Sequence, residues 1–383
     1  MLEEEIGLAL IRQNADLFYF TGTVQDGHLV IPHTGNPCFF VWRSYKRALE
    51  ESPLARLGWV QPLNGLSHFV QLVKEAGLDS QKVVGLEFDV LPAGFFRFYS
   101  QKVWPDARFK DISPLIRRIR SIKDESEIES IKAACQQAYH AIKRVPSFLE
   151  KAETELELAA MVEAELRKRG HCGLMRMRIW NQEMGMDQVV SGPNATFPSW
   201  TNTPVGGLGP HPAFGMGASS KKIGRDVLVS VDLGGWYKGY MCDTTRPFFI
   251  GSPPAEVLDV FKVVKKLMGQ LEKMLTPGTK AGSVYDHALS VMEMSGYADS
   301  FMGLGAERVS FVGHGLGIEL DEYPFISKGN DMVLKKGMVV ALEPKIILPD
   351  YGVVGLEDTY VIGEKGATRL TLGEQELKVI KKP

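Results

Sequence analysis

The feature that most constrains this chain is the recurrence of acidic residues inside segments that otherwise resemble apolar β-strands. In these segments the apolar residues recur at every second position, which is the period of a strand. Carboxylates are seldom buried without a partner, because removing a charge from water is costly. We therefore expect them to meet one another or a cation; they are Asp232 in VLVSVDL, Asp243 in YMCDTTRPFF, Glu343 in VVALEPKI and Glu357 in VVGLEDTYVI.

Asp232 and Asp243 are predicted to lie close together across an antiparallel pair of strands. Side chains alternate between faces along a strand, so Asp232 points away from the face that carries the alternating valines of VLVSVDL. A turn at Gly234-Gly235 would return the chain as YKGYMCDTTRPF and bring Asp243 near Asp232. Two carboxylates this close repel each other unless a proton or a cation lies between them.

A histidine completes the candidate site. Taken singly, each acidic residue is more often a strand-end or surface carboxylate, but His314 in the glycine-rich turn GHGLG adds an imidazole to the set. Four carboxylates and one imidazole suit two divalent ions if some carboxylates bridge, and Mn²⁺, Fe²⁺, Co²⁺ and Zn²⁺ all remain open. Such a pair of ions can deprotonate a water and polarise a carbonyl oxygen, which is the chemistry of amide hydrolysis.

The length of 383 residues favours two domains. The first hundred or so residues alternate short apolar runs with turns and one helical stretch, Leu66–Ala76, which is typical of a small α/β domain. The basic connector DISPLIRRIRSIK follows, and the remaining chain predicts an α+β domain. We place the two domains at residues 1–115 and 116–383.

Helix signals in the second domain are specific. Asp124 or Ser126 can cap a helix that begins in DESEIESIKAACQQAYHAIKRV, and Thr154 to Glu157 form a capping box ahead of LAAMVEAELRKRG. Further helices are predicted at Pro254–Met274 and Ser283–Ser295.

Composition excludes several classes of partner. The net charge of −2 offers no basic footprint for nucleic acid or an anionic membrane. No apolar run reaches the length of a membrane helix, and the start MLEEEIGLAL is acidic where a signal peptide would be basic, so we expect a soluble, cytoplasmic protein. The four scattered cysteines predict reduced thiols. Short peptides or small molecules are the expected substrates.

At these segments the sequence resembles the pita-bread metallopeptidase family, in its Xaa-Pro aminopeptidase, prolidase and creatinase branch. GRDVLVSVDLG, GYMCDTTRPFFIG, FVGHGLGIELDEYP, GMVVALEP and GLEDTYVI match, in order, the segments that supply the family's five ligands. NADLFYFTG resembles the N-terminal domain of that branch, and RRIRSIKDESEIESIKAA resembles the linker and first catalytic helix. The resemblance implies a pita-bread catalytic domain preceded by a smaller creatinase-type α/β domain.

The resemblance also implies roles for individual residues. Asp243 and Glu357 would bridge two metal ions, Asp232 would complete one ion, and His314 with Glu343 would complete the other. Glu343 would also move a proton from the attacking water to the leaving nitrogen. Two divalent ions per chain, with manganese favoured, and a homodimer are expected on the same ground.

Three departures from the family pattern concern substrate handling rather than the ligands. Where the family's peptidases usually carry a second histidine, this chain has Asp321 in DEYP. A further histidine normally follows SGPN; here a Gly/Pro-rich insertion follows instead, and His211 within it is the candidate substitute or part of a mobile lid. Xaa-Pro enzymes often have an arginine before the last ligand, where this chain has Gly355. Arg176 and Arg178 could supply positive charge near the cleft, or face solvent.

Three functions follow from these residues. The first is a dinuclear aminopeptidase or dipeptidase that hydrolyses the N-terminal bond of short peptides, with Xaa-Pro as a candidate sequence. The second is an amidohydrolase or lyase acting on a small non-peptide substrate, because Asp321 would favour a cationic group. The third is a non-catalytic binding protein, which the five retained ligand residues disfavour.

Overall fold

The computed structural model describes residues 5–381, which divide into two compact units. The first unit contains the described residues as far as Arg120 together with Arg178–Asn181. The second contains Ser121–Met177 and the described residues from Gln182 onward. The candidate ligand residues all belong to the second unit.

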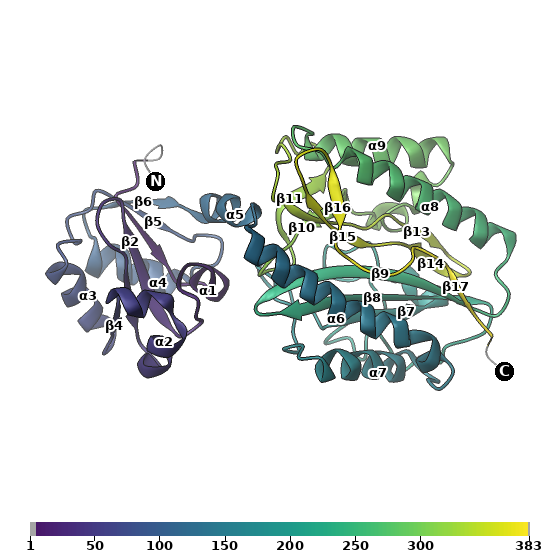
Figure 1. The fold of residues 1–383 in the computed structure, drawn as a ribbon, viewed down its shortest axis with the longest axis horizontal. Coiled ribbons are helices and arrows are strands. Elements are labelled where there is room, and N and C mark those ends of the chain that lie inside the picture. The colour runs from purple at the N-terminus through teal and green to yellow at the C-terminus, as the bar shows by residue number, and fades with distance from the viewer. Residues whose placement is uncertain (1–4, 382–383) are drawn as a thin grey trace. The chain divides into compact units, whose positions relative to one another are not determined.

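A six-stranded mixed sheet, in the order β4-β3-β2-β1-β5-β6, forms the first unit (Figure 1). Alternate residues of β1 enter two apolar clusters, Ala9 and Ile11 in one and Leu8 and Leu10 in the other, so both faces of the sheet are covered. The predicted small α/β domain is confirmed. Its elements are β1 (Leu8–Ile11), α1 (Asn14–Thr21), β2 (Gly27–Pro32), β3 (Cys38–Val41), α2 (Tyr45–Glu51), β4 (Val60–Pro62), α3 (Leu66–Glu75), β5 (Val83–Leu86), α4 (Ala93–Phe98), β6 (Arg108–Asp111) and α5 (Ser113–Ser121).

The second unit is built on sheets whose strands come from distant parts of the sequence. One sheet has the order β17-β9-β8-β7, a second has the order β11-β10-β12-β15-β16, and β13 pairs with β14. The strands are β7 (Asp187–Ser191), β8 (Val227–Tyr237), β9 (Tyr240–Ile250), β10 (Phe311–Gly315), β11 (Glu322–Ser327), β12 (Val339–Leu342), β13 (Lys345–Leu348), β14 (Gly352–Gly355), β15 (Asp358–Ile362), β16 (Ala367–Arg369) and β17 (Lys378–Ile380).

Helices cover these sheets in two apolar clusters. Buried residues of α6 (Glu125–Leu149) and α7 (Glu155–Lys168) pack with Val229 and Val231 of β8, while those of α8 (Ala255–Met274) and α9 (Ala281–Met294) form the other cluster (Figure 1). The predicted capping residues are confirmed, since both Asp124 and Thr154 start their helices with complete capping boxes. Among the described residues, no helix combines the length and apolarity needed to span a membrane.

Three local predictions were wrong. The hairpin between β8 and β9 turns at Lys238 and Gly239, whose positive φ angles suit a two-residue turn, and Gly234-Gly235 continue the strand. GVVGLEDTYVI is two strands, and Glu357 lies in the break between them. His314 lies within strand β10 and not in a turn, because its neighbours pair with β11 and β12.

Candidate metal centre

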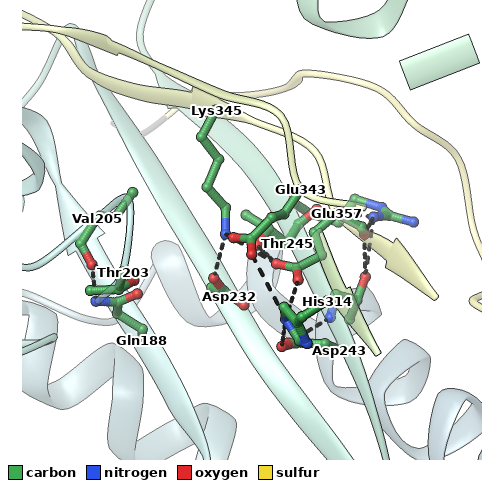
Figure 2. Close-up of polar contacts among 12 residues, drawn as sticks. Gln188, Thr203, Val205, Asp232, Asp243, Thr245, His314, Glu343, Lys345 and Glu357 are labelled. Carbon is green, nitrogen blue, oxygen red and sulfur yellow. Dashed lines mark hydrogen bonds and ion pairs between the residues drawn. The ribbon is translucent and has the colours of Figure 1, made fainter. Parts of the chain in front are cut away.

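The five predicted ligand side chains converge in the second unit (Figure 2). Asp232 and Asp243 come from β8 and β9, His314 comes from β10, and the glutamates lie just beyond β12 and β14. Strand pairing is interrupted after β12 and after β14. At these interruptions the side chains of Glu343 and Glu357 point toward the other carboxylates. Four of the five are buried; they are Asp243, His314, Glu343 and Glu357.

Strand register explains how Asp232 and Asp243 share one face of the hairpin. Asp232 lies opposite Thr245, and Asp243 lies opposite Gly234, so the two aspartates are diagonal neighbours on the same face. Thr245 Oγ1 donates a hydrogen bond of 2.7 Å to Glu357 Oε2, which fixes that carboxylate above the hairpin. The predicted proximity thus arises from the register, although the turn lies further along the chain.

One cluster of donor atoms surrounds the Nε2 atom of His314. This nitrogen lies 3.8 Å from Asp243 Oδ2, 3.7 Å from Glu343 Oε1 and 4.0 Å from Glu357 Oε1. Donor atoms of Asp243, His314 and Glu357 all lie within 4.8 Å of one another, which suits ligands of a single ion bound at about 2 Å. Glu357 Oε1 is buried without a hydrogen-bond partner, as a ligand atom awaiting a cation would be.

The histidine is oriented to offer this nitrogen. His314 Nδ1 lies 2.9 Å from Leu320 O and 3.1 Å from Gly315 O, and a carbonyl oxygen can only accept. The proton of the neutral ring therefore resides on Nδ1, which leaves a lone pair on Nε2 for a metal. Asp321 Oδ1 lies 3.5 Å from the same Nδ1 atom, so Asp321 adds negative charge behind the imidazole.

A second cluster of carboxylate oxygens surrounds Lys345 of β13, which the sequence analysis did not single out. Its Nζ atom donates to Glu343 Oε2 at 2.7 Å, Asp232 Oδ2 at 3.0 Å and Glu357 Oε2 at 3.1 Å (Figure 2). The signal that could have found it is a lysine opening the apolar strand KIIL two positions after Glu343. A lysine there is buried and requires anionic partners.

The electrostatics of the cluster are those of crowded, buried carboxylates. Burial raises the pKa of Glu357 to about 8, with Lys345 lowering it and Asp232 and Glu343 raising it further. Burial together with Glu357 and Asp232 raises the pKa of Asp243 well above its usual range. These groups therefore favour either a proton or a cation, and a divalent ion is the stronger stabiliser of several carboxylates at once.

Hydrogen bonds behind the cluster hold the backbone of its ligands. Asp243 and Thr359 exchange two bonds, from the Asp243 N–H to Thr359 Oγ1 and from the Thr359 hydroxyl to Asp243 O. Arg246 Nη1 donates to Glu357 O at 2.8 Å, and its Nη2 donates to Asp358 Oδ1 at 2.6 Å. Such supporting contacts fix the direction of ligand side chains.

The cluster lies at one side of an open cavity within the second unit. Its lining includes Asp232, His314, Asp321, Glu343 and Lys345. The remaining lining is rich in thioethers, which adapt to varied apolar groups; these residues are Met175, Met177, Met184, Met186 and Met216.

Asp187 of β7 is a further cavity residue that the sequence analysis missed. Its Oδ2 atom is buried without a hydrogen-bond partner. Burial, with Glu163 and Asp232 adding negative charge, raises its pKa well above the usual range. In the sequence it is one of many acidic residues near turns, so only its pairing opposite Leu233 of β8 reveals its place.

The residues predicted to contact substrate lie in different parts of the structure. Asp321 lines the cavity. His211 is exposed in a short turn with Phe214 and lies outside the set of cavity-lining residues, so its predicted substitution for a family histidine is not supported by its position. Arg178 was predicted near the cleft or in solvent, but it is buried in the first unit, where it pairs with Asp16 and Asp89.

Comparisons with known proteins identify the families that both parts of the chain match. The model of metallopeptidase family M24 matches residues 129–364, and that of the creatinase/prolidase N-terminal domain matches residues 1–122. A Xaa-Pro dipeptidase of Pyrococcus furiosus is 29% identical over 98% of this chain and 97% of its own. The prolidase structure from Pyrococcus horikoshii has a TM-score of 0.81 at 28% identity, covering 98% of this chain and 97% of that one. An X-Pro aminopeptidase structure from Thermotoga maritima has a TM-score of 0.81 at 25% identity, with 99% of both chains covered.

Proposed function

The chain belongs to metallopeptidase family M24, and on that premise we propose that its five converging side chains bind catalytic metal for the hydrolysis of short peptides. The predicted fold class, with a creatinase-type domain ahead of a pita-bread catalytic domain, is confirmed, as is the prediction of a metal-dependent dipeptidase or aminopeptidase. The observation that carries the site proposal is the carboxylate and imidazole cluster on the wall of an open cavity.

The donor set fits divalent metal. Carboxylate oxygens of Asp243, Glu343 and Glu357 lie within 4.0 Å of His314 Nε2, and one of them is the buried, unpartnered Glu357 Oε1. A bound ion there would supply an activated water and a polarised carbonyl group. Carboxylate-rich ligands with one imidazole suit manganese, which we propose as the metal, with places for two cations in each chain.

Glu343 is the proposed general base and acid. Its Oε1 atom faces His314 Nε2, its Oε2 atom accepts from Lys345, and its side chain lines the cavity. A carboxylate in this place can take a proton from water and return it to a departing nitrogen. Leu320 O holds the imidazole of His314 in the orientation that leaves Nε2 free.

The cavity suits a short peptide with an apolar side chain. Five methionine thioethers can adapt to its shape, and Asp321 can bind a cationic group such as a free amino terminus. Because the chain is similar to a Xaa-Pro dipeptidase and an X-Pro aminopeptidase, we propose peptides with proline after the scissile bond as the first substrates to test. A cytoplasmic homodimer is part of the same proposal.

The test is peptide hydrolysis with Mn²⁺, Co²⁺, Fe²⁺ and Zn²⁺ each supplied. We expect Xaa-Pro dipeptides or tripeptides to be cleaved, and Glu343→Gln to lower kcat/KM by about 10²–10⁴-fold because the proton carrier is lost. Glu293→Gln, at an exposed helix position, is the matched control and should leave kcat/KM unchanged. No cleavage of any peptide with any of these metals would overturn the proposal.

Asp321 favours a second candidate, an amidohydrolase acting on a small cationic amide. If that function holds, peptides remain intact while a cationic amide is hydrolysed, and Asp321→His lowers that activity by removing the anion that binds the substrate. Unchanged activity of Asp321→His would count against it.

A further inference from the structure

The candidate metal centre contains two groups of oxygens, and the ammonium group of Lys345 lies in one of them. Glu343 and Glu357 each divide their oxygens between the groups: the Oε1 atoms face His314 Nε2, and the Oε2 atoms accept from Lys345 Nζ. Asp243 completes the first group, and Asp232 completes the second. The two cation positions are therefore separate, although they share two carboxylates.

At the second position, the ammonium group of Lys345 uses all its hydrogen-bond donors. A lysine ammonium has three N–H donors, and each of the three contacts at 2.7, 3.0 and 3.1 Å takes one carboxylate oxygen from a different residue. These are oxygens that a metal ion at this position would also require. An ion and the ammonium cannot both occupy it, because two cations at one place repel and compete for the same lone pairs.

The backbone opposite Lys345 is shaped to admit this side chain. Lys345 pairs with Gly355 across β13 and β14. A Cβ atom at position 355 would lie 2.6 Å from Lys345 Cγ, closer than carbon atoms approach without strain. The departure from the family pattern at Gly355 thus gives Lys345 its path to the carboxylates.

We propose that Lys345 is a built-in cation that takes the second metal position, so that each chain holds one divalent ion with Asp243, His314, Glu343 and Glu357. This inference rests on the proposed metal site. It assigns the second charge to a fixed ammonium group, which neutralises carboxylates but is no Lewis acid. The Lewis-acid chemistry then falls to the ion beside His314.

The test is metal stoichiometry, measured by titration calorimetry with Mn²⁺ and by elemental analysis of dialysed protein. We expect one Mn²⁺ per wild-type chain. Lys345→Ala vacates the position, and Lys345→Gln is neutral and one atom shorter, so both are expected to bind two ions. If a weak second ion does bind the wild type by displacing the lysine, its affinity should rise by about 10–100-fold in the variants.

Two controls separate this inference from the site proposal. Lys221→Ala removes a partly buried lysine that donates to Ser191 O and should keep one ion per chain. Circular dichroism confirms that each variant is folded, and Lys345→Gln preserves most of the packing if Lys345→Ala is unstable. Two ions of similar affinity in the wild type would overturn the role of Lys345 while leaving the metal site intact. No bound ion in any of these proteins would overturn both.

Discussion

At the scale of single residues, several buried acidic groups lie beside a group that compensates their charge. In the second unit, the Lys345 ammonium group compensates carboxylates of the metal centre, and the proposed metal site beside His314 would do the same. In the first unit, Asp16 is fully buried between the guanidinium groups of Arg120 and Arg178. Burial opposes its ionisation, yet these arginines hold the pKa of Asp16 below its usual range.

Glu87 adjoins Asp16 and gives a prediction about pH. Its Oε2 atom accepts from the N–H groups of Arg12 and Gln13, and burial together with Asp16 raises its pKa well above the ordinary 4.5. Because the folded state holds the proton more tightly, this group's stabilisation is complete below pH 4.5 and declines as pH rises toward the folded pKa, by at most about 1.4 kcal/mol per pH unit. Glu87→Gln cannot ionise, so its stability relative to wild type should increase over that range.

Urea unfolding of both proteins from pH 4.5 to 8 measures this difference, since other titrating groups cancel between them. Glutamine keeps an acceptor for Arg12 and Gln13 and, like the protonated carboxyl group, carries a donor toward Asp16, so the buried contacts persist. If the difference between the two free energies of unfolding does not change with pH, Glu87 is ionised in the folded protein or titrates as it does in the unfolded chain.

At the scale of elements, the close approach of helix α6 to strand β8 fixes the hairpin that carries both aspartates. Gly235 permits it, because a Cβ atom there would lie 2.1 Å from Ala134 O of α6 and 2.8 Å from Cys242 Sγ of β9. A backbone oxygen in a long helix cannot move aside alone. The glycine is therefore required for packing rather than for a turn.

We expect Gly235→Ala to destabilise the protein by about 1–3 kcal/mol through overpacking. Gly269→Ala in helix α8 is the matched control: nothing lies within 4 Å of its added Cβ, and the better helix former should stabilise by about 0.5–1 kcal/mol. Urea unfolding followed by circular dichroism measures both changes. An unaltered Gly235→Ala protein would mean that α6 and β8 can separate without cost.

At the scale of the whole molecule, the site depends on strands that are far apart in the sequence. Asp232 and Glu357 are 125 positions apart, yet both contact Lys345, and closing such distances costs chain entropy that the surrounding core must repay. A bound metal would increase the stability of the folded state, because it binds the assembled cluster and not the dispersed ligands of the unfolded chain.

Metal removal should therefore lower the stability of the protein. With Mn²⁺ at about 100 times its dissociation constant, the free energy of unfolding should exceed the value in chelator by about 2.7 kcal/mol. Thermal unfolding with and without chelator measures this, and Asp243→Asn, which lacks one ligand oxygen, should show a much smaller difference. Equal stabilities of the wild-type protein in Mn²⁺ and chelator would indicate that the cluster binds the ion weakly or not at all.

Sequence alone determined the elements whose signals are local. Capping residues such as Asp124 and Thr154 mark helix starts because they bond to backbone groups three positions away, and the period of two marked β8 and β9. The five ligand candidates could also be named, because acidic residues in apolar strands require compensation and the family resemblance gave their order.

Only the tertiary structure decided how those residues meet and which cation compensates them. Strand register placed Thr245 opposite Asp232, and the breaks after β12 and β14 turned Glu343 and Glu357 toward the hairpin. Lys345 became part of the centre because Gly355 left room for its side chain. These outcomes depend on contacts between segments distant in the sequence, whose geometry is set by the packing of the whole unit and not by any local pattern.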